Sequence, residues 1–312
     1  MNTPSSSLME TVIDLAGVSR RFDARLALDG VTLAVPRGCV FGLVGENGAG
    51  KTTLIKHVLG LLRPESGSVR VFGRDPVGDP VGVLSRVGYL SELRDLPAWM
   101  RVEELLRYSR AFYPKWDDAY AESLRAQFGL DPQARIQHLS RGESAKAGLV
   151  IALAHRPELL LLDEPSSGLD PVVRRDILEA IIRTVAEEGR TVFFSSHLLD
   201  EVERVSDQVA MMVEGRMVLA GPLEEIKLTH HQLTLRFDQP QAHAPVIAGA
   251  LSVVGAGQEW TVLCNGTRPE LVEAAGKLGA RVVAERHPSL DEIFVARAAK
   301  KVPAAARVPT HS

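Results

Sequence analysis

The chain has 312 residues, of which 45% are hydrophobic and 24% charged, with a formal net charge of −3. This length allows about two domains, and the near-neutral charge makes the chain a poor candidate for non-specific nucleic-acid binding, which depends on a broad basic surface. The two cysteines, Cys39 and Cys264, are far apart and form no pattern with histidines, which argues against a disulfide framework or a zinc site and favours a reducing compartment.

The sequence offers no segment of its own for entering a membrane. The first residues, MNTPSSSLMETVIDL, hold no basic stretch followed by an apolar one, so we predict no signal peptide there. No run approaches the ~18 apolar residues that a membrane span needs. Any link to a membrane is therefore predicted to go through a partner.

The first third of the chain predicts strands, a turn and one helix. Residues 12–35 read as two short strands around a turn. The apolar run 39–45 predicts a strand buried on both faces, and a helix is predicted to start at Lys51. Residues 66–76 predict a further strand and turn.

The next segment, 84–140, has a different composition. Half of the sixteen aromatic residues of the chain fall between Tyr89 and Phe128, and the apolar residues there follow a helical period. This pattern predicts a separate helical lobe, with bounds at about 92–145.

Strands then alternate with helices. Residues 158–165 and 191–197 predict buried strands, with a helix over about 172–188 between them, and 208–221 predict two more strands around a turn. This alternation predicts an α/β domain over 10–222 with a mostly parallel sheet covered on both sides.

The pattern of predicted elements changes again after Pro222. Strands are predicted at 232–238, 260–266 and 280–286 and helices at 269–278 and 290–296, which makes residues 223–297 a small α+β domain. Residues 298–312 are rich in alanine and proline and contain no acid, so we predict a disordered tail.

A phosphate-binding loop is predicted between the strand at 39–45 and the helix from Lys51. The pattern G-x-x-x-x-G-K-[ST] is met by Gly45, Glu46, Asn47, Gly48, Ala49, Gly50, Lys51 and Thr52, with Thr53 following. Its glycines let backbone N–H groups wrap around phosphate oxygens, Lys51 adds a positive charge, and the Thr52 hydroxyl is a ligand for Mg²⁺. The alternative is a glycine-rich turn that binds nothing, and the flanking strand and helix argue against it.

Two acids end the second buried strand. Asp163 and Glu164 follow four leucines, and adjacent carboxylates there are costly unless a cation or a partner satisfies them. We predict that Asp163 holds Mg²⁺, directly or through water, and that Glu164 accepts a proton from the attacking water. The alternative is that both acids cap the next element, near Pro165.

With these motifs in order, residues 10–222 resemble the ABC ATPase family of P-loop NTPases. The segment Leu139-Ser140-Arg141-Gly142-Glu143 is similar to the family's LSGGQ signature, and Ser167-Gly168-Leu169-Asp170 is similar to its D-loop. His197 stands at the place of the switch histidine, and Phe22 at the place of an aromatic ring that stacks on adenine. The resemblance implies an N-terminal antiparallel β part, bound ATP and Mg²⁺, and ATP hydrolysis with Lys51, Glu164 and His197 as catalytic residues.

The signature segment has its own physical logic. Ser140 and Glu143 have the spacing of a capping box, and the free N–H groups and dipole at the start of a helix favour an anion. The resemblance implies that Ser140, Gly142 and Asp170 act across a dimer interface, so that the chain pairs as a homodimer or with another ABC ATPase. The alternatives are an ordinary capping box, a helix cap for Asp170 and a structural role for His197.

Three positions depart from the family pattern. Arg141 replaces the usual glycine and Glu143 the usual glutamine of the signature, but Ser140 and Gly142 are kept, so we expect hydrolysis to survive. Glu92 replaces a glutamine that senses Mg²⁺ and the membrane partner in the family. We expect Glu92 to approach the metal and nucleotide and to mark a subclass that serves exporters.

The chain resembles the stand-alone ATP-binding subunits of bacterial ABC-2 type exporters, including an appendage that ends in 288–294. This implies a separate integral-membrane permease, a peripheral place on the cytoplasmic side of the cell membrane and no nucleic-acid partner. Trp99, Tyr108 and Tyr113 are predicted to line a groove for a helix of the permease, unless these rings form the core of the lobe.

A second function stays open from the sequence. A regulatory ABC ATPase coupled to a membrane sensor, which transports nothing, would carry the same motifs. Translation factors and DNA-repair members of the family fit less well, because this chain has one ATPase domain and no long coiled coil. No residue here is predicted to contact a transported substrate.

Overall fold

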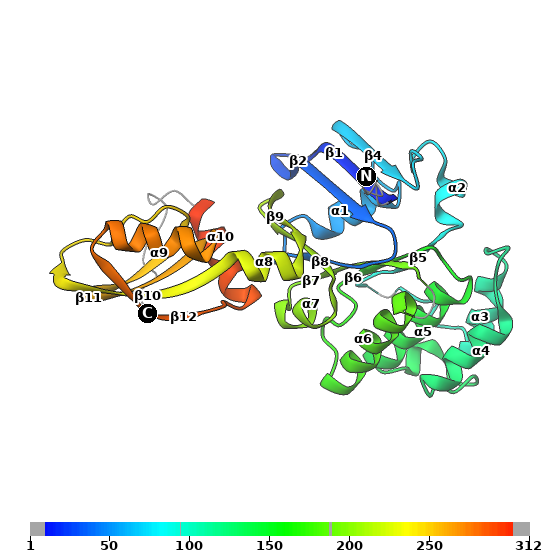
Figure 1. The fold of residues 1–312 in the computed structure, drawn as a ribbon. Helices are drawn as coiled ribbons and strands as arrows, with labels where there is room; N and C mark the ends of the chain where they lie inside the picture. The colour runs from blue at the N-terminus through cyan, green and yellow to red at the C-terminus, as the bar shows by residue number, and fades with distance from the viewer. Residues whose placement is uncertain (1–9, 94, 187–188, 302–312) are drawn as a thin grey trace, which may run out of the picture. The chain divides into compact units, whose positions relative to one another are not determined.

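The computed structural model describes residues 10–93, 95–186 and 189–301, and the chain divides into two compact units at Ala220 and Gly221 (Figure 1). Each unit has its own hydrophobic cluster, one of buried residues between Val12 and Met212 and the other of buried residues between Leu233 and Ala280. Among the described residues, none of the helices combines the length and the apolar composition that crossing a membrane requires.

The first unit opens with an antiparallel sheet of order β2-β1-β4. Its strands are β1 (Thr11–Phe22), β2 (Arg25–Pro36) and β4 (Ser66–Val71). Alternate residues of β1 and β2, such as Ile13, Leu15, Leu33 and Val35, are buried because antiparallel sheets place every second side chain on the core face.

A six-stranded sheet of order β5-β6-β7-β3-β8-β9 forms the centre of the first unit. The strands are β3 (Val40–Val44), β5 (Val87–Leu90), β6 (Leu159–Asp163), β7 (Thr191–Ser196), β8 (Gln208–Val213) and β9 (Arg216–Pro222). The pairs β5–β6, β6–β7, β7–β3 and β3–β8 are parallel. Every residue of β3, β6 and β7 is buried, as expected for strands covered on both faces.

Helices cover both faces of this sheet (Figure 1). Helix α1 (Lys51–Val58) lies between the antiparallel sheet and the central sheet, where Leu54, Ile55 and Val58 join the core. On the opposite side lie α5 (Arg141–Ala154), α6 (Pro171–Ala186) and α7 (Leu199–Val205). Because β3, β6 and β7 are parallel neighbours, their carboxyl ends meet at one edge of the sheet, which is where ligands bind in open α/β sheets.

The helical lobe contains α3 (Val102–Arg110), α4 (Asp118–Gln127), a short 3₁₀ turn (Ile136–His138) and the start of α5. The segment 84–140 is interpreted from its sequence as a helical lobe with bounds at about 92–145. The helical interpretation is wrong for β5, which lies before those bounds and pairs with β6 at the edge of the central sheet. Helix α2 (Pro80–Leu84) and helix α7 are also absent from the prediction. All three are four to seven residues long, too short for a periodic pattern to stand out.

The second unit is a three-stranded antiparallel sheet of order β11-β10-β12 with helices. Its elements are α8 (Leu223–Thr229), β10 (His230–Gln241), β11 (Ala250–Asn265), α9 (Arg268–Lys277), β12 (Ala280–Arg286) and α10 (Leu290–Lys301). Leu233, Leu235 and Phe237 of β10 point into its core. Helix α10 continues to Lys301, into the segment predicted to be disordered, and the rest of that predicted tail lies outside the described residues.

Candidate active site

The predicted phosphate loop connects β3 to α1, as its pattern requires. Gly50 caps α1 with φ of +109°, a conformation that residues with a Cβ avoid, and a Cβ at Gly50 would lie 2.5 Å from the Ala27 carbonyl oxygen. A Cβ at Gly45 would lie 2.6 Å from the Met212 carbonyl oxygen. At these two positions the loop therefore approaches β2 and β8 so closely that only glycine fits.

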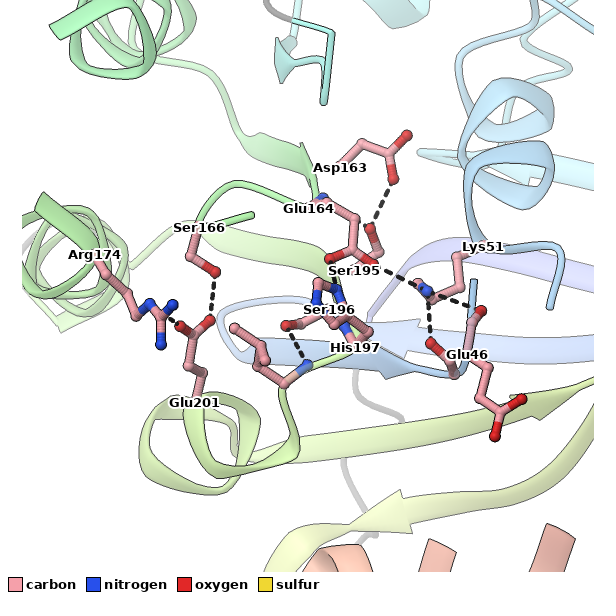
Figure 2. A network of polar contacts seen from close by, with 12 residues as sticks. Glu46, Lys51, Asp163, Glu164, Ser166, Arg174, Ser195, Ser196, His197 and Glu201 are labelled. Carbon is pink, nitrogen blue, oxygen red and sulfur yellow. Dashed lines mark hydrogen bonds and ion pairs between the residues drawn. The ribbon is translucent and has the colours of Figure 1, made fainter. Parts of the chain in front are cut away.

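Lys51 is buried at the start of α1 and its ammonium group has three close oxygens. Nζ donates to the carbonyl oxygens of Gly45 at 2.6 Å and Glu46 at 3.2 Å, and lies 2.9 Å from Oε1 of Glu164 (Figure 2). The side chains of Lys51 and Glu164 are each 6% exposed. The positive charge is thus held at the loop by neighbours that phosphate oxygens could replace.

The two acids at the end of β6 are both buried, and Ser195 of the neighbouring strand β7 contacts both. The Ser195 hydroxyl donates to Oδ1 of Asp163 at 2.7 Å and accepts the backbone N–H of Glu164 at 3.0 Å. Glu164 has φ of +47°, the left-handed region that is unusual for a residue other than glycine. Outliers of this kind concentrate at functional sites.

His197 follows β7 and contacts the carboxylate oxygen of Glu164 that Lys51 leaves free, Oε2. Its Nδ1 lies 2.7 Å from Oε2 of Glu164, and because a carboxylate oxygen only accepts, Nδ1 carries the proton. The backbone N–H of His197 also points to Oε2, at 3.4 Å. Glu164 therefore sits between a buried ammonium and a half-exposed imidazole, which fixes its carboxylate in one place (Figure 2).

A cavity of about 510 Å³ opens in front of these groups. It is lined by predicted site residues from four parts of the chain, namely Phe22, Asn47, Gly48, Gly50, Lys51, Thr52, Thr53, Glu92 and Glu164, and also by Arg25 and Ala27. Phe22 ends β1 and its ring is 41% exposed, so a flat ligand can reach it. Ala49 faces the hydrophobic core instead, while its N–H donates to the Glu46 carbonyl oxygen.

The donor atoms at this cavity are those that Mg²⁺ prefers. Thr52 lines the cavity, and Asp163 directly precedes Glu164, whose buried Oε1 lies 2.9 Å from Lys51 Nζ. Mg²⁺ takes oxygen ligands and is held by one or two protein groups together with substrate phosphates. Within the described ranges no three His, Cys, Asp or Glu residues cluster as a metal cage. The donor set fits Mg²⁺ held jointly with a phosphate ligand.

The signature segment lies at a different cavity. Ser140 caps α5, where its hydroxyl accepts the N–H of Glu143 at 3.2 Å and Oε2 of Glu143 accepts the N–H of Ser140 at 2.8 Å. The hydrogen bond from the backbone N–H of Ser140 is the main cause that lowers the pKa of the Glu143 carboxyl. A hollow of about 420 Å³ is lined by Glu92, Leu93, Leu139, Ser140, Arg141, Ser144, Ser167 and Gly168. Glu92 is the residue that both linings share.

Gly142 and Asp170 have clear local roles in the single chain. Gly142 is buried, and a Cβ there would lie 2.8 Å from the Val173 side chain. Oδ1 of Asp170 accepts the N–H groups of Val172 and Val173, at 3.0 and 3.1 Å, and so caps α6. The helix-cap alternative for Asp170 therefore holds within one chain.

Three residues that the sequence analysis did not single out, Ser166, Arg174 and Glu201, connect the turn after Glu164 to α6 and α7. The Ser166 hydroxyl donates to Glu201 of α7, and Nε of Arg174 in α6 lies 2.9 Å from the same buried carboxylate (Figure 2). Burial raises the pKa of Glu201. Polar residues in short amphipathic segments give little signal alone, because their partners come from distant parts of the chain.

The aromatic residues of the lobe divide into two groups. Trp99, Tyr108 and Phe112 are 66%, 50% and 62% exposed, and the rings of Tyr108 and Phe112 pack edge to face with centroids 5.1 Å apart. Tyr113 instead stacks on His155 with centroids 3.9 Å apart, and burial raises its pKa. Tyr113 thus belongs to the packing of the lobe, as the alternative for these rings stated.

The chain is similar in sequence to ATP-binding subunits of transporters. A family model described as ABC transporter matches residues 28–167. Nod factor export ATP-binding protein I of Rhizobium johnstonii is 31% identical over 307 residues, covering 95% of this chain and 97% of that protein. The daunorubicin/doxorubicin resistance ATP-binding protein DrrA of Streptomyces peucetius is 33% identical over 251 residues, covering 78% of this chain and 74% of that protein.

The fold agrees with the sequence comparison. A solved structure described as the ATP-binding subunit of an ABC transporter superposes with a TM-score of 0.64 and 31% sequence identity. The match covers 70% of this chain and 92% of that one.

Proposed function

This chain belongs to the ABC transporter family as an ATP-binding subunit, and we propose that it hydrolyses ATP in a pair to drive a separate membrane permease, one that exports its substrate. The observation that carries the catalytic part is the position of Glu164. Its buried carboxylate lies 2.9 Å from Lys51 Nζ and 2.7 Å from His197 Nδ1, at the wall of the phosphate-loop cavity.

The predicted site residues at the cavity each have a role in this proposal. Phe22 stacks on the adenine ring, and the N–H groups of residues 45–53 with Lys51 hold the β- and γ-phosphates. Thr52 and Asp163 would hold Mg²⁺, with Glu92 beside it, and the bound ion would neutralise charge on the phosphates. Geometry supports these roles through the lining of one cavity by the loop, Phe22, Glu92 and Glu164.

The reaction is the transfer of the γ-phosphoryl group to water. The water oxygen bonds to the γ-phosphorus, the bond from that phosphorus to the β–γ bridging oxygen breaks, and Glu164 accepts the proton that the water loses. ADP and inorganic phosphate are the products. His197 holds Glu164 through Nδ1 and, in the proposal, meets the γ-phosphate with the rest of its half-exposed ring.

Pairing supplies the part that one chain lacks at its phosphate loop. Ser140 lies at its own cavity, and its helix start offers N–H groups and a positive dipole end. In the proposed dimer, Ser140 and Gly142 of one subunit meet the ATP of the other, and Asp170 adds contacts across the interface. The pair forms as a homodimer or with a second ABC ATPase.

The permease is the partner proposed for the exposed rings Trp99, Tyr108 and Phe112. Relatives named for Nod factor export and for drug resistance support an exporter and a peripheral place at the cytoplasmic face of the cell membrane. Exposed aromatic clusters of this kind mark interaction sites. Replacing Trp99 and Tyr108 by alanine should keep basal hydrolysis and abolish stimulation by the permease, whereas loss of folding in these variants would refute docking.

The proposal is tested by ATP hydrolysis of the purified chain beside Glu164→Gln, with mass measured by light scattering in ATP and Mg²⁺. We expect hydrolysis by the parent and an ATP-bound dimer of Glu164→Gln that does not turn over. Glu179→Gln is the matched control, because Glu179 is exposed on α6 in a weak surface pair with Arg175. A chain that neither hydrolyses ATP nor dimerises would overturn the proposal.

A further inference from the structure

The hydroxyl of Ser195 lies between the two acids that end β6. Strands β6 and β7 run parallel with Asp163 opposite Ser195 in the register, and the Ser195 side chain is completely buried. From this place the hydroxyl donates to Oδ1 of Asp163 at 2.7 Å and accepts the N–H of Glu164 at 3.0 Å (Figure 2). One hydroxyl thus uses its proton on one acid and a lone pair on the backbone of the next.

The bond to Asp163 fixes a buried charge. Asp163 is 1% exposed, and an ionised carboxylate removed from water needs hydrogen-bond donors. A hydroxyl that donates to a carboxylate makes a short, strong bond, as the 2.7 Å separation indicates. With Oδ1 engaged by Ser195, Oδ2 is the oxygen left to serve a cation.

The bond to Glu164 holds an unusual backbone. With φ of +47° Glu164 is in the left-handed region, and such residues persist only where their surroundings determine them. Proline follows at 165 and further restricts the conformation of Glu164. The Ser195 oxygen accepts the N–H of this same residue, so it secures the turn that aims the carboxylate at Lys51 and His197.

We infer that Ser195 is a positioning residue that sets Asp163 and Glu164 relative to each other, so that the metal ligand and the general base act at one phosphate. The inference rests on the proposed function, because it assigns these roles to the two acids. Ser195 is not among the residues that line the phosphate-loop cavity. It acts through Asp163 and Glu164, and serine suits the site because it is small, donates and accepts.

Ser196 provides a matched control on the same strand. It is also completely buried, and its hydroxyl accepts the N–H of Leu198 at 3.0 Å. Because side chains alternate along a strand, Ser195 and Ser196 point to opposite faces. Ser195→Ala therefore removes a buried hydroxyl that contacts the two acids, whereas Ser196→Ala removes a buried hydroxyl that points away from them.

The test compares Ser195→Ala, Ser195→Cys, Ser195→Thr and Ser196→Ala in the full chain. Removing a group that orients a metal ligand typically lowers metal affinity or activity by roughly 10- to 100-fold, and we expect a loss of kcat of this size in Ser195→Ala and Ser195→Cys. Cysteine is close to serine in shape but is only a weak hydrogen-bond donor and acceptor, and threonine keeps the hydroxyl, so Ser195→Thr should recover most of kcat. Ser196→Ala should stay within about threefold of the parent.

A second readout does not depend on turnover. Thermal unfolding is measured with ATP in EDTA and with ATP and Mg²⁺. Ser195→Ala and Ser195→Cys should keep the stabilisation by ATP alone and lose the additional stabilisation by Mg²⁺, while Ser196→Ala keeps both. Parent-like kcat and Mg²⁺ response in both Ser195 variants, or an equal loss in Ser196→Ala, would overturn the inference.

The same data separate this inference from the proposed function. If the parent hydrolyses ATP and Ser195 is indifferent, the inference alone fails. If the parent does not hydrolyse ATP, the proposed function fails, and the Mg²⁺-dependent stabilisation still decides whether Ser195 orients Asp163. If Ser195→Ala does not fold, as circular dichroism would show, Ser195→Cys answers the question.

Discussion

Glu164→Gln should bind ATP more tightly than the parent, because the Glu164 carboxylate is paired with the lysine of the phosphate loop. Lys51 Nζ lies 2.9 Å from Glu164 Oε1, with both side chains 6% exposed. ATP must draw this ammonium toward its phosphates and so must weaken the pair. Glutamine keeps the shape of the side chain and removes its charge, so less is given up when ATP binds.

The size of the effect follows from the environment of the pair. A hydrogen bond to a charged group contributes about 1.5–3 kcal/mol, and loss of the upper part of this range corresponds to roughly 30- to 150-fold tighter binding at 1.4 kcal/mol for each factor of ten. Lys51 keeps its bonds to Gly45 and Glu46, at 2.6 and 3.2 Å, so the loop itself stays in place. The nucleotide-free variant should be less stable by a similar free energy.

Calorimetric titration with ATP in EDTA measures this affinity without turnover. Glu179→Gln carries the same chemical change on the exposed face of α6 and should bind ATP like the parent. Equal or weaker binding by Glu164→Gln would falsify the competition between Glu164 and phosphate for Lys51. It would mean that the ion pair persists when ATP is bound.

Three further predictions concern other parts of the chain. A side-chain hydrogen bond from Arg86 is the main cause that lowers the pKa of Glu158 from 4.5 to about 2. The stability that the ionised Glu158 contributes is therefore present above pH 4.5 and is lost as the pH falls toward 2. Urea unfolding of Glu158→Gln across this window should depend less steeply on pH than that of the parent. Burial raises the pKa of the Cys39 and Cys264 thiols to about 11, so a thiol reagent at pH 8 should modify the native chain at least ~100-fold more slowly than the chain in urea. Arg141→Gly should keep hydrolysis within about threefold and cost less than about 1 kcal/mol, because the exposed Arg141 side chain takes no part in the capping box; a large loss of turnover would show that the arginine acts at the site.

The parts of the site that the sequence could predict are those encoded locally. A continuous apolar strand, a glycine pattern and a helix start are all contained in residues 39–58, and the structure places them as β3, the loop and α1. The predicted α/β architecture with a mostly parallel sheet is confirmed. It could be predicted because each buried strand is encoded by its own local run of apolar residues. The catalytic roles given to Lys51, Glu164 and His197 stay predictions.

Features that depend on lateral neighbours could not be predicted. Nothing in the run TVFFSSH tells which serine faces the acids, because that depends on the register of β7 against β6. The packing of Tyr113 on His155 joins residues 42 positions apart, and the strand β5 is an edge strand of only four residues. In each case the local pattern was too short or its partner too distant for periodicity to reveal it.

The positions of the two cavities bear on the proposed pairing of two chains. Within one chain the phosphate loop lines one cavity and Ser140 the other, and Glu92 borders both. Glutamate at this position places a carboxylate where a phosphate-bearing ligand and a helix start are to meet. A dimer that closes around ATP must therefore bring this charge near Mg²⁺, where it is favourable, or leave it facing phosphate, where it is repelled. Closure and metal binding should thus be more tightly linked in this chain than in one with glutamine, which carries no charge to satisfy.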